Sequence, residues 1–359
     1  MPAKTIVLTG THLTPAWALM EQLHKHGYKI VYLGRSRSML DSRQPAAEKQ
    51  LLADTPVEFH PLLTVRWPWA ALTLGWSLTQ AVVYLIKHKA LAVVSFGGNV
   101  ALPVALAAKF IGIPLVIHEQ TFGAGLTSRL TAPLAKFIAI SWPESRRFFP
   151  AKKTVLIGNP LRLAVVAAKR KKPGNNQPTL YITGGNQGSL TINTAVTQIL
   201  PEFLKHYQIY HQFGLVQHEA LWLKQSRWAA TLPEKLKGNY HLKRWFSSEE
   251  LTEILALRPL VIGRAGANTI TELSFLNLTA VIIPLPTAAK NEQLTNARYL
   301  EKRGLALVLP QNRLNPESLK AAISRAQKTL PLKTKSAAPA VSAASDKLYQ
   351  LVIKAVKGV

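Results

Sequence analysis

Short apolar runs that end in a glycine turn and lead into a helix-like segment recur along this chain, and they constrain its fold most. Residues 262–272, IGRAGANTITE, pass from such a run through a turn at Gly263 and Gly266 into a helix that carries Glu272 about one turn in. α/β proteins hold phosphate in this way, because free N–H groups and the positive end of the helix dipole face the anion. A carboxylate one turn further can accept hydrogen bonds from a sugar diol. The stretch favours a nucleotide ligand, although a tight structural connection has the same pattern.

Strand-like and helix-like segments alternate from the start of the chain. Residues 5–10, 15–26 and 28–33 read as strand, helix and strand, which indicates a right-handed βαβ unit. Further strands are expected at residues 57–62, 90–96, 114–118, 137–141 and 155–157. The alternation restarts after Asn159, with strands expected at residues 179–183, 208–213, 240–243, 260–262, 280–283 and 306–309.

The predicted architecture is therefore α/β, with two doubly wound parallel-sheet (Rossmann-like) domains that face a cleft. A chain of 359 residues with 48% hydrophobic content can bury two cores. We expect an N-terminal domain at residues 1–158 and a C-terminal domain at residues 159–335. Residues 336–359 read as a linker and a C-terminal helix that packs back on the body.

The charge balance favours an anionic partner. The chain has 44 Lys and Arg against 18 Asp and Glu, which gives a net charge of +26. Such a field attracts polyanions or an anionic membrane surface. Both halves share the excess, which fits a generally basic proteome or proximity to a membrane better than a single nucleic-acid face. The absence of cysteine excludes disulfides, a thiol nucleophile and cysteine metal sites. The first residues lack the features of a signal peptide, so a cytoplasmic location is expected.

Residues 68–86 test that expectation, because they hold no charged residue over 19 positions, close to the length that crosses a bilayer. Polar residues interrupt the stretch, and aromatic and basic residues surround it, which suits a helix lying at an interface. These residues are Trp67, Trp69, Trp76, Tyr84, Arg66, Lys87, His88 and Lys89. Contact with a membrane surface or an ordinary buried helix is favoured over a span.

Three glycine turns mark the expected ligand sites, at residues 97–98, 184–188 and 263–266. None is a Walker A loop or a GxGxxG fingerprint, which disfavours ATP hydrolysis and a standard dinucleotide site. The aspartates at positions 41, 54 and 346 are widely separated, so no metal site is expected. A bound pyrophosphate would instead be neutralised by backbone amides, helix ends and Arg162 or Arg264.

Other polar residues end strands at the same predicted edge. His12 follows the first strand and can take a proton from an attacking hydroxyl, or can be a surface or capping residue. His118 and Glu119 end another strand, where one of them can be a base or an orienting group, or the pair can simply satisfy loop amides. Residues 291–293 can bind sugar hydroxyls or form an exposed loop.

Seven short motifs occur in a consistent order from His12 to about Ala306: THLTPA, SFGGNVALP, IHEQ, GNPLR, GGNQG, RAGANTITEL and PTAAKNEQLTNA. Together they resemble the MurG family of GT-B glycosyltransferases. That family moves N-acetylglucosamine from UDP-N-acetylglucosamine to undecaprenyl-pyrophosphoryl-N-acetylmuramoyl-pentapeptide, turning lipid I into lipid II in peptidoglycan synthesis. The resemblance implies an inverting, metal-independent transferase that requires no cofactor and acts at the cytoplasmic face of the membrane as a peripheral protein.

The resemblance also implies roles for individual residues. His12 falls at the family's candidate base, and Glu119 is a second catalytic candidate. The donor set comprises Arg162, Gly185, Asn186, Gln187, Arg264, Ala267, Asn268, Thr269, Glu272, Glu292 and Gln293. Within this set, Arg162 is implied near the diphosphate and Glu272 at the ribose hydroxyls. The acceptor set comprises Thr11, Gly97, Gly98, Asn99 and Thr121. Membrane contact is implied for Trp67, Trp69, Trp76, Tyr84, Lys87 and Lys89, and no specific nucleic-acid partner is expected.

The departures from the family pattern lie in the N-terminal half. Only Gly10 precedes Thr11 and His12, where the family usually has GGTGGH. Asn99 stands where Tyr is usual, and Thr121 replaces an Asn. A UDP-sugar donor is therefore better supported than the lipid I acceptor. Two alternatives stay open: a related transferase with another lipid acceptor such as diacylglycerol, and a non-catalytic basic protein that binds lipid or nucleic acid.

Overall fold

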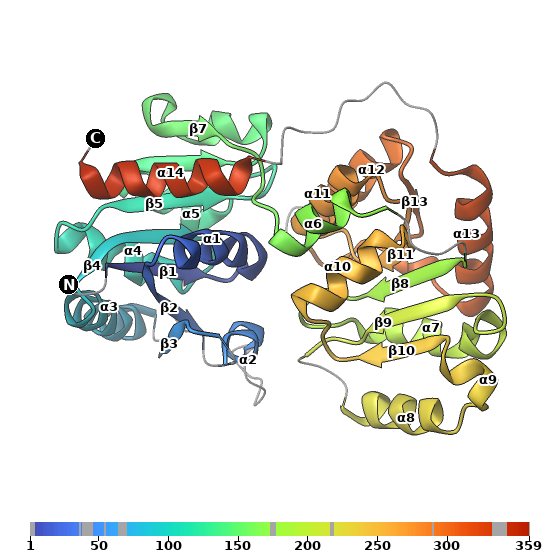
Figure 1. Cartoon of the computed structure of the whole chain (residues 1–359). Coiled ribbons are helices and arrows are strands. Elements are labelled where there is room, and N and C mark those ends of the chain that lie inside the picture. The colour runs from blue at the N-terminus through green and yellow to red at the C-terminus, as the bar shows by residue number, and fades with distance from the viewer. Residues whose placement is uncertain are drawn as a thin grey trace. The chain divides into compact units, whose positions relative to one another are not determined.

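The computed structural model describes residues 4–35, 37, 46–53, 55–63, 70–172, 177–215, 219–288, 291–331 and 343–358. The chain divides into two compact units (Figure 1). The first unit comprises Met1–Arg162 together with Ala340–Val359, and the second comprises Leu163–Pro339. Trp67 and Trp69 lie outside the described residues, as do most of the expected linker and the aspartates at positions 41 and 54.

A parallel sheet forms the centre of the first unit. Its described strands are β1 (Thr5–Gly10), β2 (Lys29–Arg35), β3 (Glu58–Leu62), β4 (Ala90–Phe96), β5 (Leu115–Glu119), β6 (Phe137–Ile140) and β7 (Thr154–Leu156). They pair in the order β3-β2-β1-β4-β5-β6-β7, and every pairing is parallel. The order reverses between β1 and β4, and such a switch point is where open α/β sheets bind ligands.

Helices cover both faces of this sheet. They are α1 (Leu13–Lys25), α2 (Ala47–Leu52), α3 (Ala70–Lys87), α4 (Ala101–Phe110), α5 (Leu126–Thr131) and α14 (Ala344–Lys357), with short 3₁₀ turns η1 (Ala132–Leu134), η2 (Pro143–Phe148) and η3 (Ala151–Lys153). Ile6 and Leu8 of β1 belong to one buried cluster and Val7 to another. Successive strand residues point to opposite faces, so both faces of β1 are buried, which explains why residues 6–8 are all apolar.

The last helix, α14, completes the core of the first unit. Leu348, Leu351, Val352 and Ala355 recur at helical spacing and join the cluster of Ile6. The Tyr349 ring stacks on His26 of the turn after α1, with centroids 4.3 Å apart. Figure 1 shows α14 and α1 together in this unit, far apart in sequence. The chain therefore returns to its N-terminal half after the second unit is complete.

The second unit repeats the architecture. Its described strands are β8 (Thr179–Thr183), β9 (Gln208–Gln212), β10 (Tyr240–Lys243), β11 (Leu260–Gly263), β12 (Ala280–Ile282) and β13 (Ala306–Val308). They pair in parallel in the order β10-β9-β8-β11-β12-β13, with the switch point between β8 and β11. Its helices are α6 (Leu163–Arg170), α7 (Leu190–Phe203), α8 (Glu219–Ala230), α9 (Glu234–Lys237), α10 (Ser248–Ala256), α11 (Ala267–Leu276), α12 (Glu292–Lys302) and α13 (Pro316–Thr329), with the turn η5 (Gln311–Arg313). The prediction of two doubly wound parallel sheets is confirmed.

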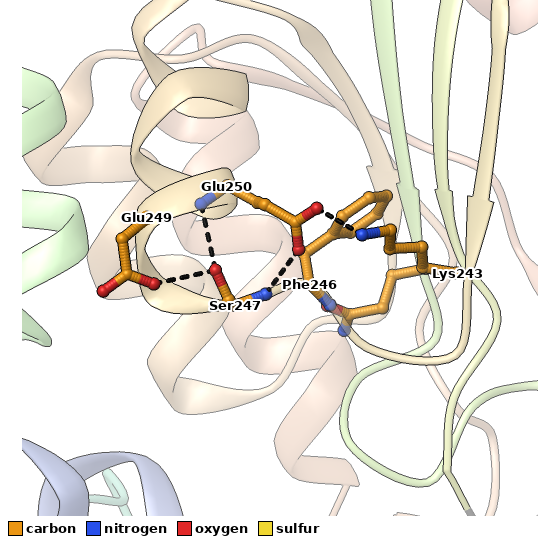
Figure 2. A network of polar contacts seen from close by, with 6 residues as sticks. Lys243, Phe246, Ser247, Glu249 and Glu250 are labelled. Carbon is orange, nitrogen blue, oxygen red and sulfur yellow. Dashed lines mark hydrogen bonds and ion pairs between the residues drawn. The ribbon is translucent and has the colours of Figure 1, made fainter.

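A capping box fixes the start of α10, where the chain leaves β10 (Figure 2). The Glu250 amide donates to Ser247 Oγ at 3.2 Å, and the Ser247 amide donates to Glu250 Oε2 at 3.0 Å. Lys243 donates to the other oxygen of Glu250, and Ser247 Oγ donates to Glu249. The hydrogen bond from Lys243 lowers the pKa of Glu250 below its ordinary value. Two backbone donors of the first turn are thus satisfied locally, which defines the helix end.

Candidate functional site

In the first unit, the loops after β1 and β4 are held against each other at the switch point. The Thr11 amide donates to Gly97 O at 3.1 Å, and Tyr32 Oη donates to Gly10 O at 2.9 Å. Gly10 has φ +136°, and a Cβ there would lie 2.7 Å from the carbonyl carbon of Phe96. Only glycine fits this close approach of two backbones. The TGTH sequence therefore forms a closely packed turn against the second loop.

His12 lies at the N-cap of α1, facing the glycine pair of the second loop. A Cβ at Gly97 would lie 3.7 Å from His12 Cδ2, and a Cβ at Gly98 would lie 2.4 Å from Thr11 Oγ1. Both glycines have positive φ, at 70° and 82°. The structure thus brings Thr11, His12, Gly97 and Gly98 together, and Asn99 follows them as an exposed residue. A side chain at either glycine would occupy the space beside the first loop.

Glu119, at the end of β5, holds the loop that follows it. Its Oε1 accepts hydrogen bonds from the Thr121 amide at 2.9 Å and Thr121 Oγ1 at 2.7 Å, and its Oε2 accepts one from the Gly125 amide at 2.8 Å. The carboxylate is only 4% exposed. This geometry agrees with the alternative in which a strand-end carboxylate satisfies loop amides. Thr121, an expected acceptor residue, is part of the same network.

Burial sets the protonation of His12. Burial lowers its pKa below the ordinary value, and the negative charge of Glu119 offsets part of that shift. An ion pair also acts on the ring: Arg35 Nε donates to Glu48 Oε1 at 2.8 Å, and both residues influence His12 electrostatically. The imidazole is therefore neutral near pH 7, which is the state that can accept a proton. This ion pair joins β2 to α2. It was not predicted from the sequence, because neither Arg35 nor Glu48 lies in a recognisable motif.

His118, next to Glu119, is enclosed in the core, whereas His12 lies at the loops of the switch point. It is 2% exposed, and its Nε2 lies 3.2 Å from Ser141 Oγ. Burial lowers the pKa of His118 to about 4, so its ring is neutral near pH 7. Among the two histidines, His12 is the one placed at the loops of the switch point.

In the second unit, the loop after β8 packs tightly on the loop after β9. Gly188 has φ +86°, and its added Cβ would lie 2.4 Å from Phe213 O. The Leu215 amide donates to Asn186 O at 3.0 Å. By contrast, a Cβ at Gly185 would meet nothing within 4 Å. The loop is therefore anchored at Gly188 and open at Gly185, and Asn186 and Gln187 lie between them, half-buried.

Arg264, after β11, links this loop to the neighbouring strand. Its Nη2 donates to Ser189 Oγ at 2.8 Å, and its Nη1 donates to Ile283 O at 3.1 Å. Burial lowers the pKa of Arg264 below its ordinary value. Ser189 is also the N-cap of α7, where its side chain accepts from the Ile192 amide. A guanidinium has five N–H donors, so these two hydrogen bonds do not use up its capacity to bind an anion.

Helix α11 begins at this switch point. Gly266 is its N-cap and has no side chain with which to cap it, so the amides of Ala267, Asn268 and Thr269 form the first turn. Glu272 lies one turn further along and is half-buried. The strand, glycine turn and helix expected for residues 262–272 are thus present, with Glu272 on the second turn of the helix.

Gln293 holds two loops of this edge together. Its Oε1 accepts from the Ala265 amide at 3.2 Å and from the Leu285 amide at 3.0 Å. Asn296 Nδ2, one turn later on α12, donates to Ala265 O at 2.8 Å. The oxygen of Gln293 therefore positions backbone, whereas the neighbouring Glu292 is a half-buried residue of the first turn of α12. Sequence reasoning missed Asn296, although it lies within the motif that contains Gln293.

Arg162 falls in a different unit from the other donor candidates. It is the last residue of the first unit before α6, whereas the remaining donor candidates belong to the second unit. Each unit thus carries its own set of loops at its own switch point.

The helix α3 presents an apolar face to solvent. Its exposed large residues are Leu72, Trp76, Val83 and Ile86, and Trp76 is 63% exposed. Tyr84 instead lies half-buried, with its ring stacked on His60 at 4.3 Å, so it does not join this face. Lys87 and Lys89 are exposed at the end of the helix. Among the helices of the described residues, none combines the length and apolar character needed to cross a membrane.

Two doubly wound units, each with glycine loops at the reversal of its strand order, define a GT-B-type fold. The chain belongs to glycosyltransferase family 28: residues 6–140 match the glycosyltransferase family 28 N-terminal domain and residues 179–351 match the C-terminal domain. Known proteins similar to it include the UDP-N-acetylglucosamine--N-acetylmuramyl-(pentapeptide) pyrophosphoryl-undecaprenol N-acetylglucosamine transferases of two bacteria. That of Clostridium kluyveri is 30% identical over 98% of this chain and 99% of the relative, and that of Idiomarina loihiensis is 34% identical over 88% and 86%.

Solved structures agree with this assignment. The crystal structure of Acinetobacter baumannii MurG is 25% identical, covers 98% of this chain and 99% of that chain, and has a TM-score of 0.65. The structure of UDP-N-acetylglucosamine 2-epimerase from Rickettsia bellii has a TM-score of 0.58 at 14% identity, over 100% of this chain and 98% of that chain. The likeness to the epimerase supports the fold alone. The likeness to the MurG structure relates this chain to MurG, as the motifs in its sequence indicate.

Proposed function

We propose that this chain transfers N-acetylglucosamine from UDP-N-acetylglucosamine to undecaprenyl-pyrophosphoryl-N-acetylmuramoyl-pentapeptide, converting lipid I into lipid II in peptidoglycan synthesis. The observation that carries the proposal is the similarity to transferases of that name over nearly the full length of the chain, at 30% identity. The loops at both switch points supply residues suited to each substrate.

The second unit binds the donor. Its α11 amides, from Ala267 to Thr269, face the pyrophosphate, and the remaining N–H groups of Arg264 add positive charge. Glu272 accepts hydrogen bonds from the ribose hydroxyls. Gly185, Asn186, Gln187, Glu292 and Gln293 line the sugar, and the resemblance to the MurG family assigns Arg162, the last residue of the first unit, to the diphosphate. With helix dipole and guanidinium charge at hand, the departing UDP is stabilised without a metal ion at the pyrophosphate.

The first unit binds the acceptor and supplies the base. Thr11, Gly97, Gly98, Asn99 and Thr121 surround the acceptor pyrophosphate. Neutral His12 takes the proton of the acceptor hydroxyl, whose oxygen attacks the anomeric carbon from the face opposite UDP. The new C–O bond forms as the bond to the UDP oxygen breaks, so the configuration inverts. Glu119 acts through His12, because its negative charge stabilises the imidazolium that results while its oxygens hold the loop.

The exposed apolar face of α3 supports the proposal that this reaction occurs at a membrane surface. Leu72, Trp76, Val83 and Ile86 would enter the interface of the cytoplasmic leaflet, and Lys87 and Lys89 would meet its anionic head groups. The protein is then peripheral and reaches a lipid-linked acceptor from the cytoplasmic side. Trp67 and Trp69, which lie outside the described residues, belong to the same proposal from sequence alone.

One observation favours a second candidate acceptor. The first loop has a single glycine before Thr11, and Thr11 Oγ1 occupies the space beside Gly98 where a Cβ would come within 2.4 Å. Such a compact loop has fewer free amides for a pyrophosphate than the glycine-rich loop of the family pattern. A related lipid without a pyrophosphate, such as diacylglycerol, is therefore the alternative acceptor.

The experiment measures UDP release from UDP-N-acetylglucosamine in the presence of a lipid I analogue or of diacylglycerol. We expect release with lipid I, and a loss in kcat of roughly 10²- to 10⁴-fold in His12→Gln, because general base catalysis contributes that much. Glu272→Gln should instead raise the KM of the donor by roughly 10-fold or more, since it weakens a charged hydrogen bond.

Two exposed residues provide matched controls. His24→Gln and Glu301→Gln change the same residue types outside the loops, and both should keep the wild-type rate. Turnover with diacylglycerol alone would establish the second candidate. No turnover with either lipid, together with tight and salt-dependent nucleic-acid binding, would refute the enzymatic proposal.

A further inference from the structure

Three potential metal ligands meet at the edge of the first sheet, away from the loops of its switch point. Glu58 and His60 alternate along β3 and so project to the same face, and His88 follows the end of α3. His60 Nε2 lies 2.9 Å from Glu58 Oε1 and 3.1 Å from His88 Nε2. His88 Nε2 lies 3.5 Å from Glu58 Oε1, which closes the triangle.

These separations match the ligand spacing of a tetrahedral ion. With Zn–N and Zn–O distances near 2.0–2.1 Å, tetrahedral ligand atoms lie about 3.3 Å apart. A point about 2.0–2.1 Å from each of the three ligand atoms lies roughly 0.9 Å outside the plane that they define. This is close to the geometry of an ion with three protein ligands and an open fourth position. An ion therefore fits with shifts of only a few tenths of an ångström.

Hydrogen bonds alone satisfy the cluster poorly. Each neutral imidazole can place its single proton on Nε2 or on Nδ1, and the ionised carboxylate only accepts. If His60 Nε2 donates to Glu58, His88 Nε2 has two choices: it shares that proton at 3.1 Å, or it donates to the same carboxylate oxygen across 3.5 Å, which is longer than a good hydrogen bond. Three lone pairs aimed at one cation avoid this conflict, because the cation satisfies all of them at once.

The surroundings hold the ligands in place. The Tyr84 ring stacks on His60 with an interplanar angle of 20°, and Lys29 Nζ donates to Glu58 Oε2 at 2.7 Å, which leaves Oε1 directed at the histidines. Such outer contacts orient ligands in known metal sites. The side chains of His88, His60 and Glu58 are 6%, 19% and 37% exposed, so the cluster is closed at His88 and open to solvent near Glu58.

We propose that Glu58, His60 and His88 bind a divalent transition-metal ion of the Zn²⁺ class, with water as its fourth ligand. Imidazole nitrogen with one carboxylate oxygen is a donor set that such ions prefer over Mg²⁺ or Ca²⁺. The ion joins β3 to the end of α3 and so fixes the helix that carries the exposed apolar face. This site shares no residue with the proposed donor and acceptor sets and does not depend on the proposed transfer reaction.

The test measures Zn²⁺ binding to the full chain by titration calorimetry, after dialysis against a chelator. We expect one Zn²⁺ per chain, a higher melting temperature with Zn²⁺ than with Mg²⁺, and visible Co²⁺ absorption typical of a four-coordinate site that Zn²⁺ abolishes. His60→Gln should weaken binding by more than the roughly 10- to 100-fold that loss of an outer contact causes. His88→Gln and Glu58→Gln, which change the other two ligands, should weaken binding in the same way.

The control is His24→Gln, which removes an exposed histidine of α1 and should bind Zn²⁺ like the wild type. Because the wild type is measured directly, poor folding of the buried His88 variant does not obscure the outcome. A wild-type chain that binds no more Zn²⁺ than the His60→Gln/His88→Gln double variant would overturn the proposal. Equal weakening by His24→Gln would overturn it as well.

Discussion

Replacing Glu119 with glutamine removes a charge while keeping the size of a buried side chain. One amide oxygen can still accept from the Thr121 amide and hydroxyl, but the new NH₂ then faces the Gly125 amide, whose hydrogen bond to Oε2 is 2.8 Å. A hydrogen bond to a charged group contributes about 1.5–3 kcal/mol, and a buried donor without an acceptor costs about 1–3 kcal/mol. We expect Glu119→Gln to lower the free energy of unfolding of the first unit by about 2–4 kcal/mol.

Hydrogen exchange measured by mass spectrometry resolves the local part of this effect. The Gly125 amide should exchange on the order of 10²-fold faster in Glu119→Gln, because each 1.4 kcal/mol is tenfold in the opening equilibrium. The Thr121 amide should change less, since it keeps an acceptor. Glu144→Gln, an exposed position, is the matched control and should leave both unchanged. Wild-type exchange at Gly125 together with wild-type stability in urea would refute the assignment of Glu119 as the residue that holds this loop.

Three further expectations concern stability. Ser247→Ala removes the capping box of α10 and should lower the free energy of unfolding of the second unit by about 1 kcal/mol, seen as a lower urea midpoint; an unchanged midpoint would contradict it. Gly188→Ala should destabilise more than Gly185→Ala, because both incur about 1–2 kcal/mol for positive φ but only Gly188 would also clash with backbone; equal urea midpoints would exclude the close packing of the loop. Burial lowers the pKa of His118 to about 4 and of His211 to about 3, so below pH 6.5 the unfolded chain binds protons that the folded chain does not. Stability in urea should therefore fall between pH 6.5 and pH 4 by up to about 1.4 kcal/mol per pH unit for each histidine, and a flat profile would contradict their neutral, buried state.

The fold was predictable because its signals are local. Short apolar runs such as residues 90–96, in which only Ser95 is polar, favour strands covered on both faces, and the structure has β4 at those bounds. Glycine turns and helical periodicity then fix the alternation. The ends of β2 differ by one or two residues from the expected residues 28–33. Pairing with neighbouring strands defines the last residues of a strand, and the sequence alone does not show that pairing.

The contacts of the site were less predictable, because they depend on pairs distant in sequence. The motif around residues 262–272 placed Glu272 on a helix, but the link from Arg264 to Ser189 requires two strands to be neighbours. The same holds for Arg35 with Glu48 and for the cluster of Glu58, His60 and His88. A motif identifies which residue types are present at an edge, and only topology decides which of them touch. The roles of the donor and acceptor residues therefore stay predictions.

Product analysis shows directly whether the chain transfers N-acetylglucosamine to lipid I. The purified chain is incubated with UDP-N-acetylglucosamine and a lipid I analogue in vesicles of anionic phospholipid, and the lipid product is identified by mass spectrometry. We expect the acceptor to gain one N-acetylhexosamine in a β linkage as UDP appears in equal amount, and His12→Gln to form far less of it. An unmodified acceptor with the wild-type chain, or a sugar joined with retained α configuration, would contradict the proposed inverting transfer.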